Sequence, residues 1–168
     1  LPRGSPVAER LEAITDEFSA GLFSPYSVVA VAAEGETVMT EKMFEMVADV
    51  SERILQETSC KVDPNSVVSP AYMRGKRVSL FEAEAFLKVA RSWPCTQREV
   101  PHWDHLGCSI AKEYEYLFEQ SVGEDRKAII IEITVPFFPF AKQSQPFIDK
   151  VYDIIDETEI NANQNSKQ

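Results

Sequence analysis

The segment GEDRKAIIIEITVPFFPFAKQSQPFIDKVYDIIDE, residues 123–157, decides the fold. Its first half predicts a strand, because side chains alternate between the two faces of a strand. One face carries only aliphatic side chains, and the other is mixed: Ile129, Ile131, Ile133 and Val135 oppose Ile130, Glu132 and Thr134. A Pro-Phe turn then leads into an amphipathic helix over QPFIDKVYDII. We therefore expect the aliphatic face to pack beneath helices.

The same plan occurs earlier in the chain, over residues 27–55. An apolar strand is predicted over about 27–33, with apolar side chains on both faces. Thr40 is a suitable N-cap for a helix that reaches Leu55. The apolar positions of this helix recur at helical spacing: Met43, Val47, Val50 and Ile54. Residues 27–55 and 128–156 thus form two strand-helix units, which indicates a structural duplication.

A short strand around Ser66 to Ser69 lies between these units, bracketed by Pro64 and Pro70. Proline cannot donate a hydrogen bond to a neighbouring strand, so an edge position is expected. Two strand-helix units with an edge strand between them predict an α+β fold, a ferredoxin-like split βαβ sandwich with helices on one face of a small sheet.

Residues 71–112 interrupt this pattern, and we interpret them as a helical, loop-rich insertion. It contains a predicted helix at about 80–91 and the loop-like stretch SWPCTQREVPHWDHLGCS. A helix over AKEYEYLFEQS follows. The second face of the sheet is only partly polar and needs a cover. We favour the insertion as that cover, with a partner domain outside this chain as the alternative.

The rest of the chain suits a single domain over residues 6–160. Residues 1–5, LPRGS, are typical of the remnant of a cleavable expression tag, so we expect native sequence from Pro6, with a short helix over 6–18. The polar segment 161–168 is expected to be disordered. No metal or cofactor is expected.

The charge balance disfavours nucleic acid as a partner. The chain has 17 basic and 27 acidic residues and a formal net charge of -10, which repels phosphate backbones and anionic membrane surfaces. It carries no signal peptide pattern and no apolar run of the roughly 20 residues that a transmembrane helix needs.

The stretch CTQREVPHWDHLGC brings together side chains that can bind zinc: Cys95, His102, Asp104, His105 and Cys108. Their spacing matches no standard zinc module, and no metal site is expected. A nucleophilic Cys-His pair lacks an orienting third group. We favour a Cys95–Cys108 disulfide that closes a surface loop, with free thiols as the alternative. Because the third cysteine is Cys60, at least one thiol stays unpaired within a monomer.

Two further groups of residues have a structural and a functional interpretation. Phe137, Phe138 and Phe140 could seal the end of the core or line a path for an apolar ligand, and we favour the seal. Arg74, Lys76 and Arg77 are the compact basic group of the chain. They suit a plain exposed turn, or contact with lipid headgroups or a carboxylate-bearing neighbour. No phosphate-binding loop or hydrolase motif occurs.

Several segments together resemble a known family. FSAGLFSPYSVVAVA resembles the passage from a membrane helix into a first porter strand, and TEKMFEMVADVSERIL the helix after it. VDPNSVVSP resembles the next short strand, and the segment 123–157 a later strand, turn and helix. The family is the extracytoplasmic porter domain of resistance-nodulation-division (RND) transporters, in particular the MMPL lipid exporters.

The resemblance implies a domain that lies outside the cytoplasm, between two membrane helices of a larger proton-driven pump for lipids or other hydrophobic compounds. It implies no enzymatic activity. Its partners would be a second porter domain, the transmembrane helices and hydrophobic cargo, and homo-oligomers are possible. No last strand is evident after Glu157, although porter subdomains of this superfamily can exchange strands. The alternatives are a stand-alone ferredoxin-like module for small-molecule binding or oligomerisation, and an enzyme built around the Cys-His insertion.

Overall fold

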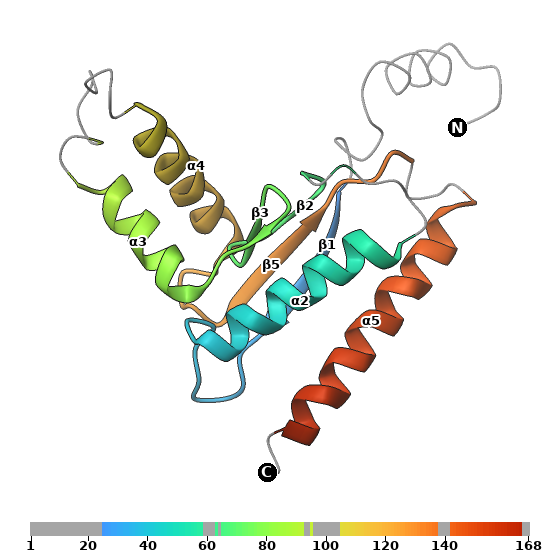
Figure 1. Ribbon diagram of the computed structural model, residues 1–168. Coiled ribbons are helices and arrows are strands. Elements are labelled where there is room, and N and C mark those ends of the chain that lie inside the picture. The colour runs from blue at the N-terminus through green and yellow to red at the C-terminus, as the bar shows by residue number, and fades with distance from the viewer. Residues whose placement is uncertain are drawn as a thin grey trace.

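The computed structural model describes residues 25–58, 63, 65–92, 95, 105–137 and 142–165, with only the backbone of 105–106 and 159–165. The predicted helix at 6–18 lies outside these residues. The described chain is α+β (Figure 1). Its elements, in order, are β1 (Tyr26–Val31), α2 (Glu41–Glu57), β2 (Val67–Val68), β3 (Tyr72–Met73), β4 (Lys76–Arg77), α3 (Leu80–Ala90), α4 (His105–Ser121), β5 (Ala128–Ile133) and α5 (Ser144–Asn165).

The main sheet has three strands in the order β1-β5-β2, and both pairs are antiparallel. Val28 lies opposite Ile131, and Ile133 pairs with Tyr26 on one side and Val67 on the other. The last strand of the sequence therefore lies in the centre. The prediction that the proline-bracketed strand occupies an edge is confirmed by the position of β2.

The core lies between this sheet and the layer formed by α2 and α5. Ile129, Ile131, Ile133 and Val135 are all buried, whereas Glu132 on the opposite face is exposed. The predicted alternation is confirmed. Phe44, Val47 and Ile54 from α2 and Phe147, Val151 and Ile154 from α5 belong to the same buried cluster.

Thr40 is the N-cap of helix α2, as predicted. The Thr40 hydroxyl accepts a hydrogen bond of 3.2 Å from the Met43 backbone N–H, which satisfies one of the unpaired donors of the first turn. Glu41 lies in the first turn, where its negative charge is favourable. Phe44 and Ser51, which the sequence pattern did not single out, are also buried on this helix.

The insertion is larger than expected. It consists of the β3–β4 hairpin, which turns at Arg74 and Gly75 with positive φ angles of 53° and 72°, and of helices α3 and α4. Helix α4 starts at His105 and runs without a break across residue 112 to Ser121, so the inserted unit does not end at 112. Likewise α5 continues to Asn165, beyond the start of the segment for which we expected disorder.

The insertion does not cover the second face of the sheet, contrary to our expectation. Val29 and Val31 on the outer face of β1 are 54% and 66% exposed. Helices α3 and α4 lie side by side and form an arm beside the β2 and β3 end of the fold, apart from α5 (Figure 1). The buried side chain of Tyr114 holds the arm there, because its hydroxyl donates to the Pro70 backbone carbonyl.

Candidate functional site

The free edge of β1 is the first unusual feature of the molecule. The Ala32 N–H donates to the Lys127 carbonyl oxygen at 2.8 Å, and in antiparallel pairing alternate residues point toward the same neighbour. The backbone N–H and C=O groups of Ser27, Val29 and Val31 therefore point away from β5. No strand in the described part of the chain pairs with this edge. Such an edge is a template for another strand.

A groove of about 500 Å³ lies next to this edge, between the sheet, α2 and α5. Its walls are mainly apolar, with Met43, Met46 and Val50 from α2, Ile155 from α5, and Val28 and Ala30 from β1. Glu36, Thr37 and Lys42 lie at one side of it. Methionine side chains adapt to ligands of different shapes, so this wall suits a flexible apolar ligand.

A second groove of about 270 Å³ continues the first along β1 and α5. Val28, Val29 and Ile155 line both grooves, and the second also contacts Tyr26 and Tyr152. The inward side chains of β1, such as Val28 and Ala30, are only half-buried, unlike those of β5. Within the described residues, the side chains of α2 and α5 thus do not fully cover the inward face of β1.

Aromatic side chains close one end of the second groove. The Phe147 ring lies 5.3 Å from the Tyr26 ring and 5.7 Å, edge-on, from the Phe137 ring, measured between centroids. Tyr26 and Phe147 line the groove, but Phe137 does not. Phe137 is half-buried and contacts the groove only through the Phe147 ring. Phe138 and Phe140 lie outside the described residues.

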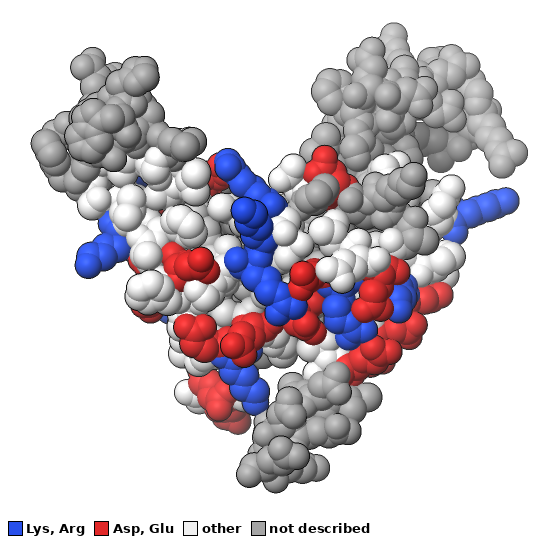
Figure 2. All heavy atoms as spheres, viewed as in Figure 1, with Lys and Arg blue, Asp and Glu red and all other residues white. Residues whose placement is uncertain are grey.

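An ion-pair network joins α2 to α5. The Arg53 guanidinium donates to Glu57 at 2.6 Å and to Glu157 at 2.5 Å, and Lys150 lies 2.8 Å from Glu57. Figure 2 shows basic and acidic side chains side by side on the face of the molecule that carries α2 and α5. The hydrogen bonds from Arg53 and then Lys150 lower the pKa of Glu57 to about 2. The network links the two helices that form the groove walls.

The basic group of the β3–β4 hairpin is largely neutralised within the chain. Arg77 pairs with Asp49 at 3.1 Å and with Glu52, and the hydrogen bond that Arg77 donates to Glu52 raises the pKa of Arg77. Arg74 pairs with Glu113 on α4. Lys76 makes no ion pair that involves only described residues. The carboxylates that neutralise this basic group thus lie on α2 and α4 of the same chain.

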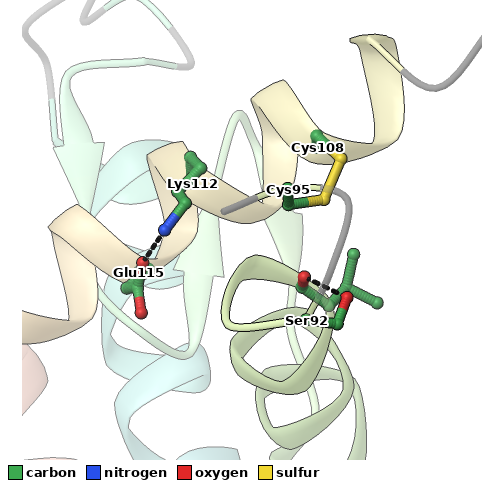
Figure 3. The surroundings of a disulfide bond; sticks show 6 residues. Ser92, Cys95, Cys108, Lys112 and Glu115 are labelled. Atoms are coloured by element: carbon green, nitrogen blue, oxygen red, sulfur yellow. Dashed lines mark hydrogen bonds and ion pairs between the residues drawn. A yellow bond between two sulfur atoms is a disulfide. The ribbon is translucent and has the colours of Figure 1, made fainter. Parts of the chain in front are cut away.

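Cys95 and Cys108 form a disulfide, with their Cα atoms 5.3 Å apart (Figure 3). The bond joins the segment after α3 to the first turns of α4. One turn below it, Lys112 pairs with Glu115, which also accepts from Arg91 at 2.8 Å. Hydrogen bonds from Lys112 and then Arg91 lower the pKa of Glu115. These contacts fasten α3 and α4 together.

The disulfide leaves neither sulfur available as a thiolate for zinc or for nucleophilic attack. His102 and Asp104, and the side chain of His105, lie outside what the structure describes. Among the described residues, no group of three or more His, Cys, Asp or Glu side chains could hold a metal ion. No helix within them is long and apolar enough to cross a membrane.

The sequence patterns identified Met43 and Val50 as apolar helix positions but did not indicate a groove. Met46, Ile155 and Tyr152 lie on the flanks of amphipathic helices, where the pattern does not separate core from groove. The sequence of α5 did contain a signal for an additional apolar surface. Its apolar positions Ile148, Val151, Tyr152 and Ile155 form a stripe that is wider than packing against the sheet alone requires.

Comparisons with known proteins found no match: no family model fits this sequence, and neither the curated proteins nor the solved structures contain a similar chain at a significant level. Function must therefore be inferred from the geometry of the open edge of β1 and the two adjoining grooves. This region can accept an extended strand or an apolar ligand.

Proposed function

We propose that this chain is an extracytoplasmic porter domain of an RND-type transporter, similar to the MMPL branch, that handles lipids or other hydrophobic compounds. The observation that carries the proposal is the apolar groove between β1, α2 and α5, which lies directly beside an unpaired strand edge. Such a site favours packing against a neighbour and passage of apolar molecules over bond-making chemistry.

The strand order supports a ferredoxin-like split βαβ arrangement. The first and second strand-helix units contribute β1 and β5, which lie side by side, and β2 follows on the far side of β5. Both α2 and α5 cover the same face. A complete ferredoxin-like sheet would place its fourth strand beside β1. That position is the open edge, and in the RND superfamily strands are exchanged between porter subdomains.

The chemistry of the larger groove supports hydrophobic cargo. Its volume of about 500 Å³ falls within the range of ligand pockets, which are mostly apolar with a few polar groups. A groove bounded by two helices and one strand changes its width if either helix shifts. A transporter domain needs that property, because its passage must open and close as domains repack.

The disulfide supports a location outside the cytoplasm. Disulfides persist in oxidising compartments and are rare in the cytosol, where thiols are kept reduced. The Cys95–Cys108 bond joins the end of α3 to the start of α4. A cross-link stabilises this arm in an extracellular, periplasmic or luminal space.

A photoactivatable fatty acid tests the groove directly. We expect ultraviolet light to attach the probe to peptides from Glu41–Glu57 and Ser144–Asn165, and an excess of unlabelled fatty acid to suppress the labelling. Met46→Glu should lower the affinity at least about tenfold, because it places a charge in an apolar wall. Met46→Leu conserves shape and should retain binding, and Tyr116→Glu on α4 is the matched surface control. Labelling confined to other peptides would contradict the proposal.

A stand-alone ferredoxin-like binding module is the second candidate. The observation that favours it is that both grooves are lined entirely within this chain, so a small ligand needs no second domain. The two functions differ in their expected surroundings. A transporter domain is attached to membrane helices, whereas a sensor module binds its ligand with full affinity as an isolated chain.

A further inference from the structure

The free edge of β1 can bind a further strand through its backbone. Ser27, Val29 and Val31 point their N–H and C=O groups away from β5, and no strand in the described part of the chain pairs with them. Their side chains are exposed on the outer face of the sheet. Because successive side chains of a strand alternate between its faces, an added strand places half of its side chains beside these residues and half in the groove under α5.

Helix α5 carries an apolar row and an acidic row beside this edge. The apolar row lines the smaller groove and consists of Ile148, Tyr152 and Ile155. Each of these residues is followed directly by an aspartate, namely Asp149, Asp153 and Asp156. Positions i, i+4 and i+7 lie on one side of a helix, so the aspartates form a second row about 100° around the helix from the first.

The acidic row is exposed and is not neutralised by described residues. Its aspartates lie opposite the side of α5 that is buried through Phe147, Val151 and Ile154. None of the aspartates forms an ion pair with a described residue, and the neighbouring Lys150 pairs with Glu57 on α2 instead. Figure 2 shows acidic side chains gathered along α5. The groove beside β1 is thus bordered by a row of negative charge.

We propose that the edge of β1 and helix α5 together bind an extended, basic segment of another protein as an additional strand. The backbone of that segment pairs with Ser27, Val29 and Val31, as in other cases of strand addition. Its lysine or arginine side chains lie in the groove, with their aliphatic stems on Tyr152 and their charged ends at the aspartates. Its other side chains are apolar and continue the exposed face at Val29 and Val31.

Charge selects this partner over a second copy of the chain. Strand β1 (Tyr26–Val31) contains no basic residue, so pairing of two copies through this edge leaves the acidic row without counter-charge. Glu36 and Lys42 of the larger groove have opposite charges and do not change this balance. The formal net charge of -10 attracts basic segments over a longer range.

The added strand does not require a transport function. It uses the same edge at which the proposed function expects a strand from a neighbouring porter subdomain, and it adds the chemistry by which that strand is recognised. The inference therefore holds equally for a stand-alone binding module.

Hydrogen exchange measured by NMR on the whole chain tests the contact. The probe is a capped peptide of about seven residues that alternates lysine and valine, long enough to cover the exposed edge. We expect binding with a Kd below about 1 mM and slower exchange of the Ser27, Val29 and Val31 N–H groups. The N–H groups of Val28 and Ala30 already point toward β5, so their exchange should change little. The same peptide with glutamate in place of lysine should bind at least about tenfold more weakly.

Variants separate the backbone contact from the charge contact. Val29→Pro removes an outward N–H and should weaken binding at least about tenfold, whereas Val29→Thr keeps the N–H and should retain binding. Asp153→Asn combined with Asp156→Asn should weaken binding of the lysine peptide about fivefold. Glu84→Gln removes an exposed carboxylate of α3 that does not line the grooves, and this matched control should have no effect. Circular dichroism verifies that each variant stays folded.

The proposal is overturned if the lysine peptide fails to bind, or if it binds without slowing exchange at Ser27, Val29 and Val31. Slow exchange of these groups in the concentrated chain without peptide would also overturn it, because the edge would then belong to a second copy. The photoactivatable fatty acid tests the apolar groove of the proposed function separately. Failure of the peptide to bind would therefore leave that result unchanged.

Discussion

The hydroxyl of Tyr114 donates a hydrogen bond of 2.7 Å to the backbone carbonyl oxygen of Pro70. Tyr114 is completely buried, and burial raises the pKa of its phenol. The bond connects α4 to the chain segment between β2 and β3. It is thus a buried polar contact between the arm and the sheet region.

We expect Tyr114→Phe to lower the free energy of unfolding by about 1–3 kcal/mol, because the Pro70 carbonyl would stay buried without its donor. Urea unfolding monitored by circular dichroism measures this change. Tyr116→Phe is the matched control, since Tyr116 lies on the same helix and is 69% exposed. Equal stability of the two variants would show that the hydrogen bond contributes nothing to the attachment of the arm.

The ion pairs of Glu57 predict a pH dependence of stability. Its pKa is lowered from 4.5 to about 2 in the folded chain, mainly by Arg53 and then by Lys150. A lowered carboxyl pKa stabilises the fold above the unfolded pKa, and that contribution is lost as the pH falls from about 4.5 to about 2. Glu57→Gln should therefore be less stable than the parent at pH 7 and equal to it near pH 2.

Chemical unfolding at a series of pH values provides the measurement. Glu45→Gln is the control on the same helix, because Glu45 makes no ion pair that involves only described residues. If the difference between Glu57→Gln and the parent stays constant from neutral to acidic pH, the charged network is not the cause. The stability of the contact between α2 and α5 would then have another cause.

The disulfide predicts a defined thiol count. Of the cysteines Cys60, Cys95 and Cys108, two are bonded to each other, so one thiol per chain should react with alkylating reagent before reduction and three after it. Cys60→Ser should abolish the reaction of the unreduced protein. Three reactive thiols without reductant would refute the bond and remove the support for an oxidising compartment.

Loss of the same bond should destabilise the arm. The cysteines are 13 residues apart, and closing a loop of that size contributes about 3 kcal/mol in the chain-entropy description. We expect Cys95→Ser to increase protease cleavage between α3 and α4 while the core of β5 stays protected from hydrogen exchange. Uniform loss of protection across the chain would show instead that the arm and the sheet unfold together.

The two faces of the sheet predict opposite responses to truncation. Ile131→Ala should cost about 2–5 kcal/mol, because Ile131 is buried against α2 and α5 and a cavity would remain. Val31→Ala should change stability by less than about 0.5 kcal/mol, since Val31 is exposed on the outer face. Thermal unfolding of both variants tests this. A large effect at Val31 would mean that a second layer covers this face.

Local patterns predicted the elements of the fold well. The alternation around Ile131 identified β5 and its buried face, Thr40 marked the start of α2, and the prolines around β2 indicated an edge strand. Each of these signals depends on a few neighbouring residues. These signals can be recognised in the sequence because each one involves residues within a single strand or a single helical turn.

The position of the insertion and the presence of the grooves could not be predicted in the same way. Nothing near Val29 and Val31 in the sequence shows that the arm packs beside β2 and leaves them exposed, because Tyr114 and Pro70 meet across a long stretch of chain. The grooves likewise arise from the spacing of α2 and α5. The two helices meet through contacts such as Arg53 to Glu157, which join residues far apart in the sequence.

Carbonate extraction of membranes tests most directly the proposal that this chain belongs to a membrane transporter. An antibody raised against the chain would detect the native protein in fractionated source cells. We predict that the signal stays in the membrane pellet at alkaline pH and that the epitope is protected from protease added on the cytoplasmic side. Recovery of the native protein in the soluble fraction would contradict the account.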